Sequence, residues 1–152
     1  MSHIENVNGV VITDLLAFEA ACKRLGVEFH KDQKTFVAFN TGHCDHAVHV
    51  PGLRYEMGLT GSPQPNGKVA FQPQLDYYSD GQEIQRRFCA KLATPTYHNV
   101  SHADPNYSVS FEKLMDAYSV EVLKAQARKK GYQPIETILP NGKIKLTVTL
   151  PN

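Results

Sequence analysis

The chain contains little of what marks secreted, zinc-ribbon and membrane proteins. Its 152 residues include no tryptophan and only three cysteines, Cys22, Cys44 and Cys89, with no CxxC spacing. An odd number without that spacing fits neither a disulfide framework nor a zinc ribbon. No run approaches the roughly 18 apolar residues of a membrane span, and MSHIENVNGV lacks the basic region and apolar run of a signal peptide. We expect a soluble protein of the reducing cytoplasm.

Neither sign of charge dominates the sequence. Sixteen Lys and Arg side chains stand against fifteen Asp and Glu, which leaves a formal charge of +1. Binding to nucleic acid or to an acidic membrane surface would need a local basic cluster, and we do not expect nucleic acid as the partner. With 41% apolar residues the chain has enough material for one compact core, so residues 1–152 are predicted to form a single domain.

Strand and helix patterns alternate along the chain. A β-branched run at 7–12 leads into a helix over 13–25, and residues 27–78 form strand-like segments separated by Gly, Pro and Asn. Helices are also predicted at 81–93 and 110–131. The fold class is therefore α+β: a mainly antiparallel sheet of about five to seven strands, one or two long helices packed on one face, and a C-terminal β-hairpin. The Asn-Gly pairs at 66–67 and 141–142 favour type I′ hairpin turns.

Short motifs spread over nearly the whole chain occur in a defined order. They are MSH at the start, Asp14-Leu15, Leu25-Gly26, Cys44-Asp45, Tyr55-Glu56-Met57-Gly58, Asp76-Tyr77-Tyr78, Lys130-Gly131-Tyr132 and Asn141-Gly142. Their order resembles an uncharacterised family of small proteins from cyanobacteria and algal plastid genomes, classed as a domain of unknown function and as a hypothetical chloroplast reading frame. The resemblance implies no catalytic residue. Because members are often encoded near an AAA-type ATPase and a ferredoxin-like protein, it implies an accessory role.

Residues 81–110 depart from that family and look like an insertion with a long loop at its end. Loops of such length are often functional. Asp76, Tyr77 and Tyr78 are expected at a strand end, where an acid between aromatic rings could frame a small ligand pocket together with His98 and His102 of the loop. The alternative interpretation, an ordinary strand terminus, is the one we favour.

The stretch HCDHAVH is the densest group of metal-ligating residue types in the sequence. Zinc accepts His, Cys and Asp ligands. Alternation along a strand would place His43, Asp45 and His49 on one face, and Cys44 and His46 on the other. A site for zinc or another divalent metal on the first three would need a further ligand, such as one of the two loop histidines. We favour the alternative, a half-exposed polar strand, and therefore predict no cofactor.

A basic cluster lies near the end of the last predicted helix. Its members are Lys124, Arg128, Lys129 and Lys130. Four cations in seven residues could contact phosphates, but positive side chains at the C-terminal end of a helix also interact favourably with the helix dipole. We favour the second interpretation, a solvated helix end.

Three functions remain open from the sequence. The first is a non-enzymatic accessory or binding protein that acts through a protein partner, an AAA-type ATPase being the candidate; it rests on the family resemblance and on the missing catalytic constellation. The second is a small-molecule or nucleotide-binding module. The third is a metal-dependent enzyme centred on residues 43–49. We favour the first, so enzymatic activity is not expected, and a homo-oligomer is compatible with all three.

Overall fold

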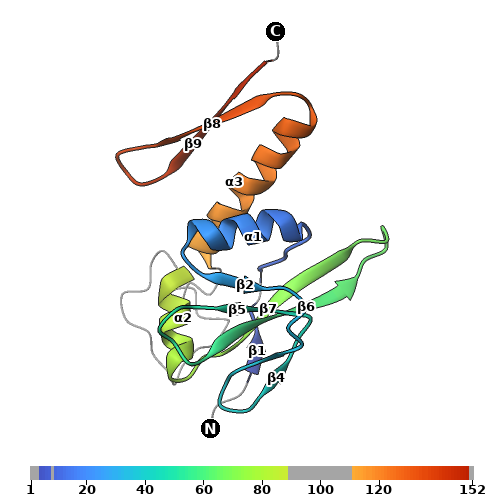
Figure 1. Cartoon of the computed structure of the whole chain (residues 1–152), viewed down its shortest axis with the longest axis vertical. Helices are drawn as coiled ribbons and strands as arrows, with labels where there is room; N and C mark the ends of the chain where they lie inside the picture. The colour runs from blue at the N-terminus through green and yellow to red at the C-terminus, as the bar shows by residue number, and fades with distance from the viewer. Residues whose placement is uncertain (1–3, 8, 89–110, 151–152) are drawn as a thin grey trace.

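The computed structural model describes residues 4–7, 9–88 and 111–150, and its centre is a five-stranded antiparallel sheet (Figure 1). The strand order across the sheet is β1-β7-β6-β5-β2. The strands are β1 (Ile4–Asn6), β2 (Glu28–His30), β5 (His46–His49), β6 (Glu56–Pro63) and β7 (Val69–Asp76). With α1 (Leu15–Arg24), α2 (Asp80–Phe88) and α3 (Glu112–Lys129), the sheet confirms the predicted α+β class.

The two faces of this sheet differ in chemistry because side chains alternate along each strand. Met57 and Leu59 of β6 point to one face, where they join a single buried core with side chains from all three helices. Glu56 and Gly58 point to the opposite face. The helices therefore pack on one face of the sheet, as predicted, and the other face is more polar.

α1 begins and ends where the sequence predicts. The Asp14 side chain accepts a hydrogen bond from the Ala17 backbone N–H at 3.0 Å, which satisfies one free donor of the first helical turn. Gly26 has a φ of 73° and stops the helix in the left-handed region. Phe18 and Cys22 are buried, so α1 contributes one face to the core.

α3 is fixed to the body of the protein by its first two turns. Leu114 and Tyr118 are buried there. The Tyr118 hydroxyl oxygen accepts hydrogen bonds from the backbone N–H groups of Thr13 and Asp14, both at 3.0 Å. In the second half of the helix only Ala127 is buried. The start of α3 is thus held against the start of α1, and its end is much more exposed.

A small two-stranded sheet, β3 (Thr35–Phe36) and β4 (Gly42–His43), covers part of the polar face of the large sheet. Phe36 is buried and packs against Cys44 and Ala47. A Cβ atom at Gly58 would lie 2.5 Å from the Phe36 ring, so only glycine fits beneath it. This packing fixes the segment of residues 31–45 over β5 and β6.

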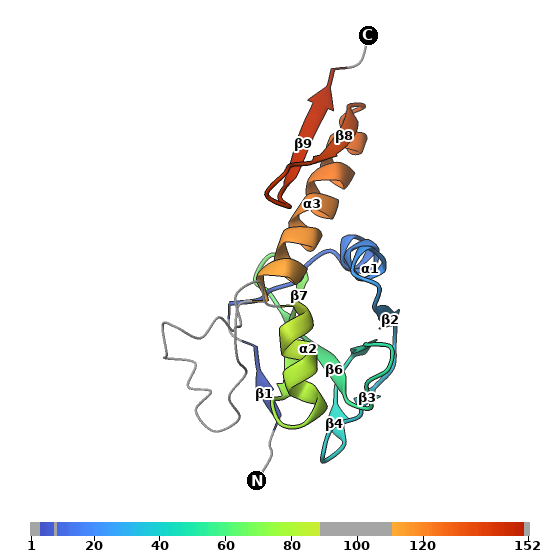
Figure 2. The same cartoon turned by 90° about the vertical axis from the view of Figure 1, so that its left-hand side faces the viewer.

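The C-terminal hairpin does not join the large sheet. It consists of β8 (Gln133–Ile138) and β9 (Ile144–Thr149), which pair only with each other in the described part of the chain. Figures 1 and 2 show the second half of α3 and this hairpin extending away from the sheet, so that β9 lies at the opposite end of the molecule from β1. We call residues 123–150 the arm.

Four charged side chains fasten the hairpin to the helices. The Arg24 guanidinium on α1 donates hydrogen bonds to Glu121 of α3, at 2.9 Å, and to Glu136 of β8. The Lys124 ammonium lies 3.3 Å from the Glu136 carboxylate. The hydrogen bond from Arg24 holds the pKa of Glu136 below its usual value. The network therefore ties α1, α3 and β8 together at neutral pH.

Both Pro-Asn-Gly-Lys turns form hairpins, but the predicted turn type is wrong. Gly67 and Gly142 have φ angles of 79° and 82°, whereas neither asparagine has a positive φ, as a type I′ turn would require. The Gly142 N–H instead donates to the Leu139 carbonyl at 2.9 Å, and the Leu139 N–H donates to the Lys143 carbonyl. This is a three-residue loop with a left-handed glycine at its end. Proline before the asparagine fixes φ near −65° and favours this geometry.

Two further predictions were an insertion at 81–110 and the absence of a membrane span. Of the segment 81–110, the structure describes α2 up to Phe88, and the loop at 94–108 lies outside the described residues. Among the helices that are described, none has the length and apolar character needed to cross a membrane. The insertion itself stays a prediction.

Candidate functional site

The structure does not group His43, Asp45 and His49 as a metal site. His43 is exposed on β4, in the small sheet, whereas His49 belongs to β5 of the large sheet. The Asp45 carboxylate accepts a hydrogen bond from the Gly61 N–H at 2.7 Å and so holds the start of β5 against β6. Across residues 4–7, 9–88 and 111–150, no three His, Cys, Asp or Glu side chains are arranged to hold a metal ion. His98 and His102 lie outside these residues.

Strict alternation through HCDHAVH is interrupted at Cys44 and Asp45, between β4 and β5. Cys44 was expected on the same face as His46, but it packs with Phe36 and Ala47 on the polar side of the sheet. His46 lies on the core side, with its ring 5.1 Å from that of Phe71. The expectation for Cys44 is therefore wrong, because the chain changes from one sheet to the other at this point.

His46 has a structural role that burial explains. Its Nδ1 accepts a hydrogen bond from the Asp32 N–H at 2.9 Å, and its ring also lies 5.6 Å from that of Phe29. Burial disfavours the charged imidazolium and lowers the pKa of His46. The residue therefore holds the turn after β2 as a neutral ring.

Asp76, Tyr77 and Tyr78 lie at the end of β7, as predicted. Both carboxylate oxygens of Asp76 accept backbone hydrogen bonds, one from the Phe39 N–H at 3.2 Å and one from the Tyr78 N–H at 3.0 Å. Tyr77 is buried in the core. Asp76 thus anchors the β3–β4 segment and the turn toward α2, and the pocket proposed with the two loop histidines cannot be built from the described residues.

The sequence patterns did not predict a polar cluster that surrounds Glu56. Glu56 is buried, and its Oε2 lies 3.8 Å from His49 Nδ1 and 4.0 Å from His30 Nδ1. The two imidazole rings are stacked with centroids 5.9 Å apart. The other oxygen, Oε1, accepts hydrogen bonds from Gln33 Nε2 at 3.1 Å and from the Val37 N–H at 3.0 Å.

The pairing of neighbouring strands assembles this cluster. Glu28 pairs with His49 and His49 pairs with Glu56, so adjacent strands place polar side chains on one face. An acidic residue inside the otherwise apolar run at 55–59 could have indicated a buried carboxylate. The hydrogen bonds of Glu56 to a backbone N–H and to the Gln33 amide show that it fixes the β3–β4 segment over β5 and β6.

Neither described cysteine is set up as a nucleophile. Burial, with a smaller effect of Glu19, raises the pKa of Cys22 to about 12. Burial also raises the pKa of Cys44, whose Sγ donates to the Gln33 carbonyl at 3.2 Å. A reactive cysteine needs a lowered pKa and an exposed, electropositive setting, so both thiols serve packing.

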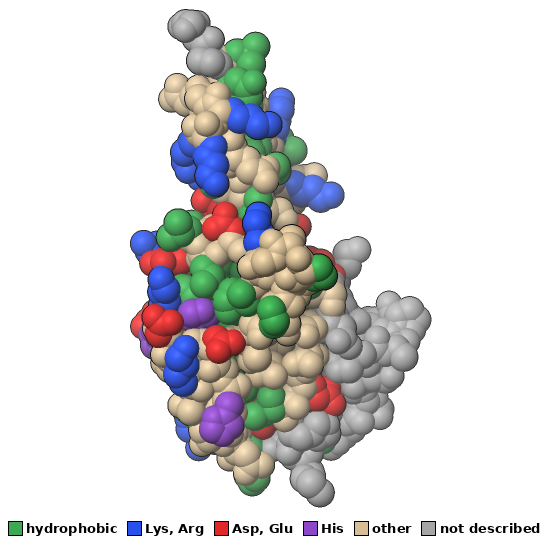
Figure 3. Space-filling model, turned by 90° about the vertical axis from the view of Figure 1, so that its right-hand side faces the viewer, with side chains coloured by type: hydrophobic (Ala, Val, Ile, Leu, Met, Phe, Trp, Pro, Cys, Tyr) green, Lys and Arg blue, Asp and Glu red, His purple; other side chains and the backbone are tan. Residues whose placement is uncertain are grey.

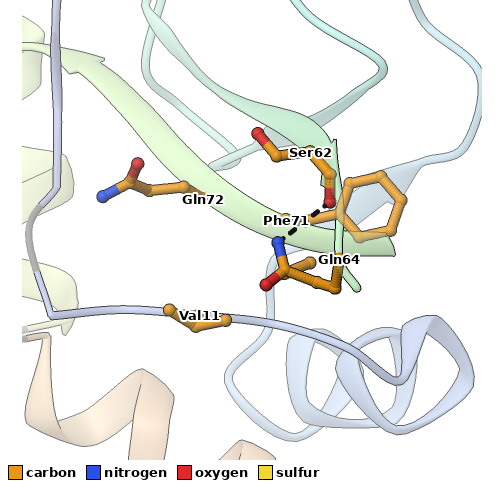
Figure 4. Close-up of a pocket in the computed structure, with 6 residues that line it drawn as sticks. Val11, Ser62, Gln64, Phe71 and Gln72 are labelled. Carbon is orange, nitrogen blue, oxygen red and sulfur yellow. Dashed lines mark hydrogen bonds between the residues drawn. The ribbon is translucent and has the colours of Figure 1, made fainter. Parts of the chain in front are cut away.

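A shallow hollow of about 210 Å³ lies between the N-terminal segment and the ends of β6 and β7. Figure 4 shows Val11 on the N-terminal segment beside the strands that carry Ser62 and Phe71, and the Gln64 side-chain N–H donates to the Ser62 carbonyl at 3.2 Å. None of its lining residues is ionisable, and its volume is below the roughly 300–1,000 Å³ of ligand pockets. Its lining therefore offers no side chain for acid–base catalysis.

The predicted basic cluster lies on the arm, which also carries Lys143 and Lys145. Residues 123–150 contain six of the sixteen Lys and Arg side chains but one acidic residue, Glu136. Of the four predicted members, Lys124 is ion-paired with Glu121 and Glu136, whereas Arg128, Lys129 and Lys130 are exposed. The six cations are Lys124, Arg128, Lys129, Lys130, Lys143 and Lys145. The arm therefore carries a formal charge of +5, although the whole chain carries +1.

The arm also exposes apolar side chains. Five of the ten large hydrophobic side chains most exposed among the described residues lie on it: Leu123, Ile135, Ile138, Val148 and Leu150. Ile138 and Leu150 are 74% and 70% exposed. Figure 3 shows Lys and Arg side chains gathered on the arm beside hydrophobic ones, while Asp and Glu lie mainly on the body. Basic and apolar groups are thus combined on a single projecting element.

Comparison with known proteins adds no relative to this description. No family model, curated protein or solved structure matches the chain.

Proposed function

We propose that the chain is a non-enzymatic accessory protein that binds a protein partner through its arm. The observation that carries the proposal is the projecting hairpin, which exposes Ile138, Val148 and Leu150 on an arm that also carries exposed cations. Clustered apolar side chains rimmed by polar groups mark interaction surfaces. An isolated two-stranded sheet is at best marginally stable in water. A partner that covers the apolar side chains of the hairpin would therefore also stabilise the hairpin.

The charge distribution favours a partner with an acidic surface. The arm carries +5 and the rest of the chain carries −4, so the two ends of the molecule attract opposite partners. The apolar side chains on the hairpin favour protein over nucleic acid, because phosphate contacts need only the cations. An AAA-type ATPase, implied by the family resemblance, is the first partner to test, and the reducing cytoplasm is the proposed setting.

Quantitative co-purification tests this proposal. Tagged chain is expressed in its host and the stoichiometry of retained proteins is measured by mass spectrometry, for the wild type and for the Val148→Ser/Leu150→Ser variant. The control is Val69→Ser/Leu16→Ser: Val69 and Val148 are each 42% exposed, and Leu16 is 82% exposed, but the control pair lies on the body. We expect one stoichiometric partner that the arm variant loses at least about tenfold and the control retains.

Two outcomes would overturn the proposal. One is that no protein is retained in stoichiometric amount. The other is that the arm variant and the body variant retain a partner equally, which would place the binding surface elsewhere. Circular dichroism and thermal unfolding of each variant establish that the exposed substitutions leave the fold intact, as expected for surface positions.

A further inference from the structure

We propose that the outer edge of β9 accepts an extended, acidic segment of the partner as a third strand of the hairpin sheet. This inference rests on the proposed function and specifies how the arm binds. Addition of a strand to an open sheet edge is a common mode of peptide recognition, in which backbone hydrogen bonds supply affinity and alternate side chains supply specificity.

The ladder between β8 and β9 shows which backbone groups are open. The Leu139 N–H donates to the Lys143 carbonyl, so the groups of these two residues point into the hairpin. Directions alternate along antiparallel strands, and therefore the N–H and C=O groups of Ile144, Leu146 and Val148 point outward. Within the described residues β9 has no strand partner except β8. Its outer edge is a row of available donors and acceptors.

The edge of β8 is less suitable. By the same alternation its outward groups belong to Pro134, Glu136 and Ile138. Pro134 has no N–H and so interrupts the row of donors. The Glu136 side chain is held by Arg24 and Lys124, which fasten β8 to the helices. Strand addition is therefore directed to β9.

The side chains of β9 define the pattern that fits beside it. Ile144, Leu146 and Val148 share one face of the hairpin, whereas Lys145 and Thr147 share the other. Lys143 lies at the start of the strand and is exposed. An added strand places its side chains beside these two sets, so apolar residues would extend the first face and acidic residues would pair with the lysines. The segment is therefore an alternation of apolar and acidic residues.

A second copy of this chain is a poorer occupant. If two β9 strands paired edge to edge, each would bring Lys143 and Lys145 to the joint sheet, and like charges across paired strands are unfavourable. The +5 charge of each arm adds to that repulsion. Charge thus selects a different chain with an acidic strand.

The test uses a fluorescein-labelled peptide of alternating Val and Glu, with six residues to match the length of β9. Binding to the full-length chain is measured by fluorescence anisotropy at neutral pH. We expect saturable binding that weakens as NaCl rises, because the lysines on this edge are exposed to solvent. A peptide of the same composition with Val and Glu in two blocks, and an alternating Val-Lys peptide, should each bind at least about tenfold more weakly.

Three variants separate backbone pairing from side-chain contact. Leu146→Pro removes an outward N–H without removing a β8–β9 hydrogen bond, and should weaken binding at least about tenfold. Leu146→Ala keeps that N–H and should retain more of the affinity. Lys145→Glu should weaken the Val-Glu peptide and strengthen the Val-Lys peptide. Hydrogen exchange at the inward amides of Thr137 and Thr147 reports whether the hairpin of each variant is still formed.

Four results would overturn the strand-addition proposal. They are no saturable binding up to about 1 mM peptide, equal binding of the block and alternating peptides, equal binding by Leu146→Pro with its hairpin intact, and lysine-dependent binding of an oligonucleotide in place of the peptide. If these occur while the arm variant still loses its co-purified partner, the arm binds by another mode and the proposed function stands. If the arm variant also keeps its partner, both proposals fail.

Discussion

Replacement of Glu136 by Gln should loosen the whole hairpin, because Glu136 joins β8 to two helices. Its carboxylate accepts hydrogen bonds from Arg24 of α1 and Lys124 of α3. Glutamine keeps the size of the side chain and one acceptor oxygen but removes the charge. Arg24 then retains Glu121, at 2.9 Å, as its carboxylate partner.

The free energy that Glu136→Gln should cost follows from the solvent exposure of Arg24 and Glu136. Hydrogen bonds to charged groups contribute roughly 1.5–3 kcal/mol when they are well shielded. Arg24 and Glu136 are 24% and 27% exposed, so solvent screening reduces the value to about 1–2 kcal/mol. That free energy corresponds to a roughly 5- to 30-fold larger population of hairpins detached from α3.

Hydrogen exchange of peptides that cover residues 133–149 measures this population directly. The matched control is Glu83→Gln, which removes a carboxylate from the exposed Glu83–Arg86 pair of α2. We expect exchange in the hairpin to rise about 5- to 30-fold in Glu136→Gln and to stay unchanged in the control. Unchanged exchange in Glu136→Gln would refute the reasoning, since the hairpin would then be held by packing alone.

The same site predicts a pH dependence. The hydrogen bond from Arg24 lowers the pKa of Glu136 in the folded protein. A lowered carboxyl pKa contributes stability that is present above the pKa of the unfolded chain and is lost as pH falls through the folded value. Hairpin protection in the wild type should therefore be constant near neutral pH and decline below about pH 4.5, and Glu136→Gln should remove that decline.

Three further predictions concern the body of the protein. Tyr118→Phe leaves the N–H groups of Thr13 and Asp14 without their acceptor and should cost about 2 kcal/mol in urea unfolding, whereas a loss below about 0.5 kcal/mol would mean that water replaces the hydroxyl. Gly81→Ala should cost about 3 kcal/mol, because its Cβ would lie 1.6 Å from the Asp76 carbonyl oxygen, and an unchanged thermal midpoint would contradict this packing. Because burial lowers the pKa of His46, the unfolded chain binds a proton first as pH falls below about 6.5. Stability should therefore decrease from pH 7.5 to 5.5, and His46→Gln should flatten that decrease relative to the wild type.

Local patterns in the sequence predicted the elements well where neighbouring residues decide the structure. The helix predicted over 13–25 is α1, and the predicted C-terminal hairpin consists of β8 and β9. The fold class followed from these patterns. Strand alternation predicted the wrong face for Cys44. The chain passes from the small sheet to the large one within two residues, and the periodicity of the sequence does not indicate this change.

The candidate site depended on contacts between distant residues. Glu56 lies near His30 and His49 only because β2, β5 and β6 are neighbours in the sheet. The order of strands in a sheet cannot be predicted from any one segment of the sequence. The basic cluster at Lys124, Arg128, Lys129 and Lys130 was predicted, and its role stays a prediction. Lys143 and Lys145 lie on the same arm as this cluster because the hairpin packs along α3. The arm is a separate unit because the hairpin lies outside the large sheet, and no local sequence pattern indicates this.

The measurement that tests the central claim most directly is hydrogen exchange of the full chain, alone and bound to its co-purified partner. Binding through the arm predicts new protection in residues 133–149, strongest at the outward amides of Ile144, Leu146 and Val148, and little change around Glu56 and His49 on the body. Protection gained on the body, with the arm exchanging as in the free protein, would contradict the account.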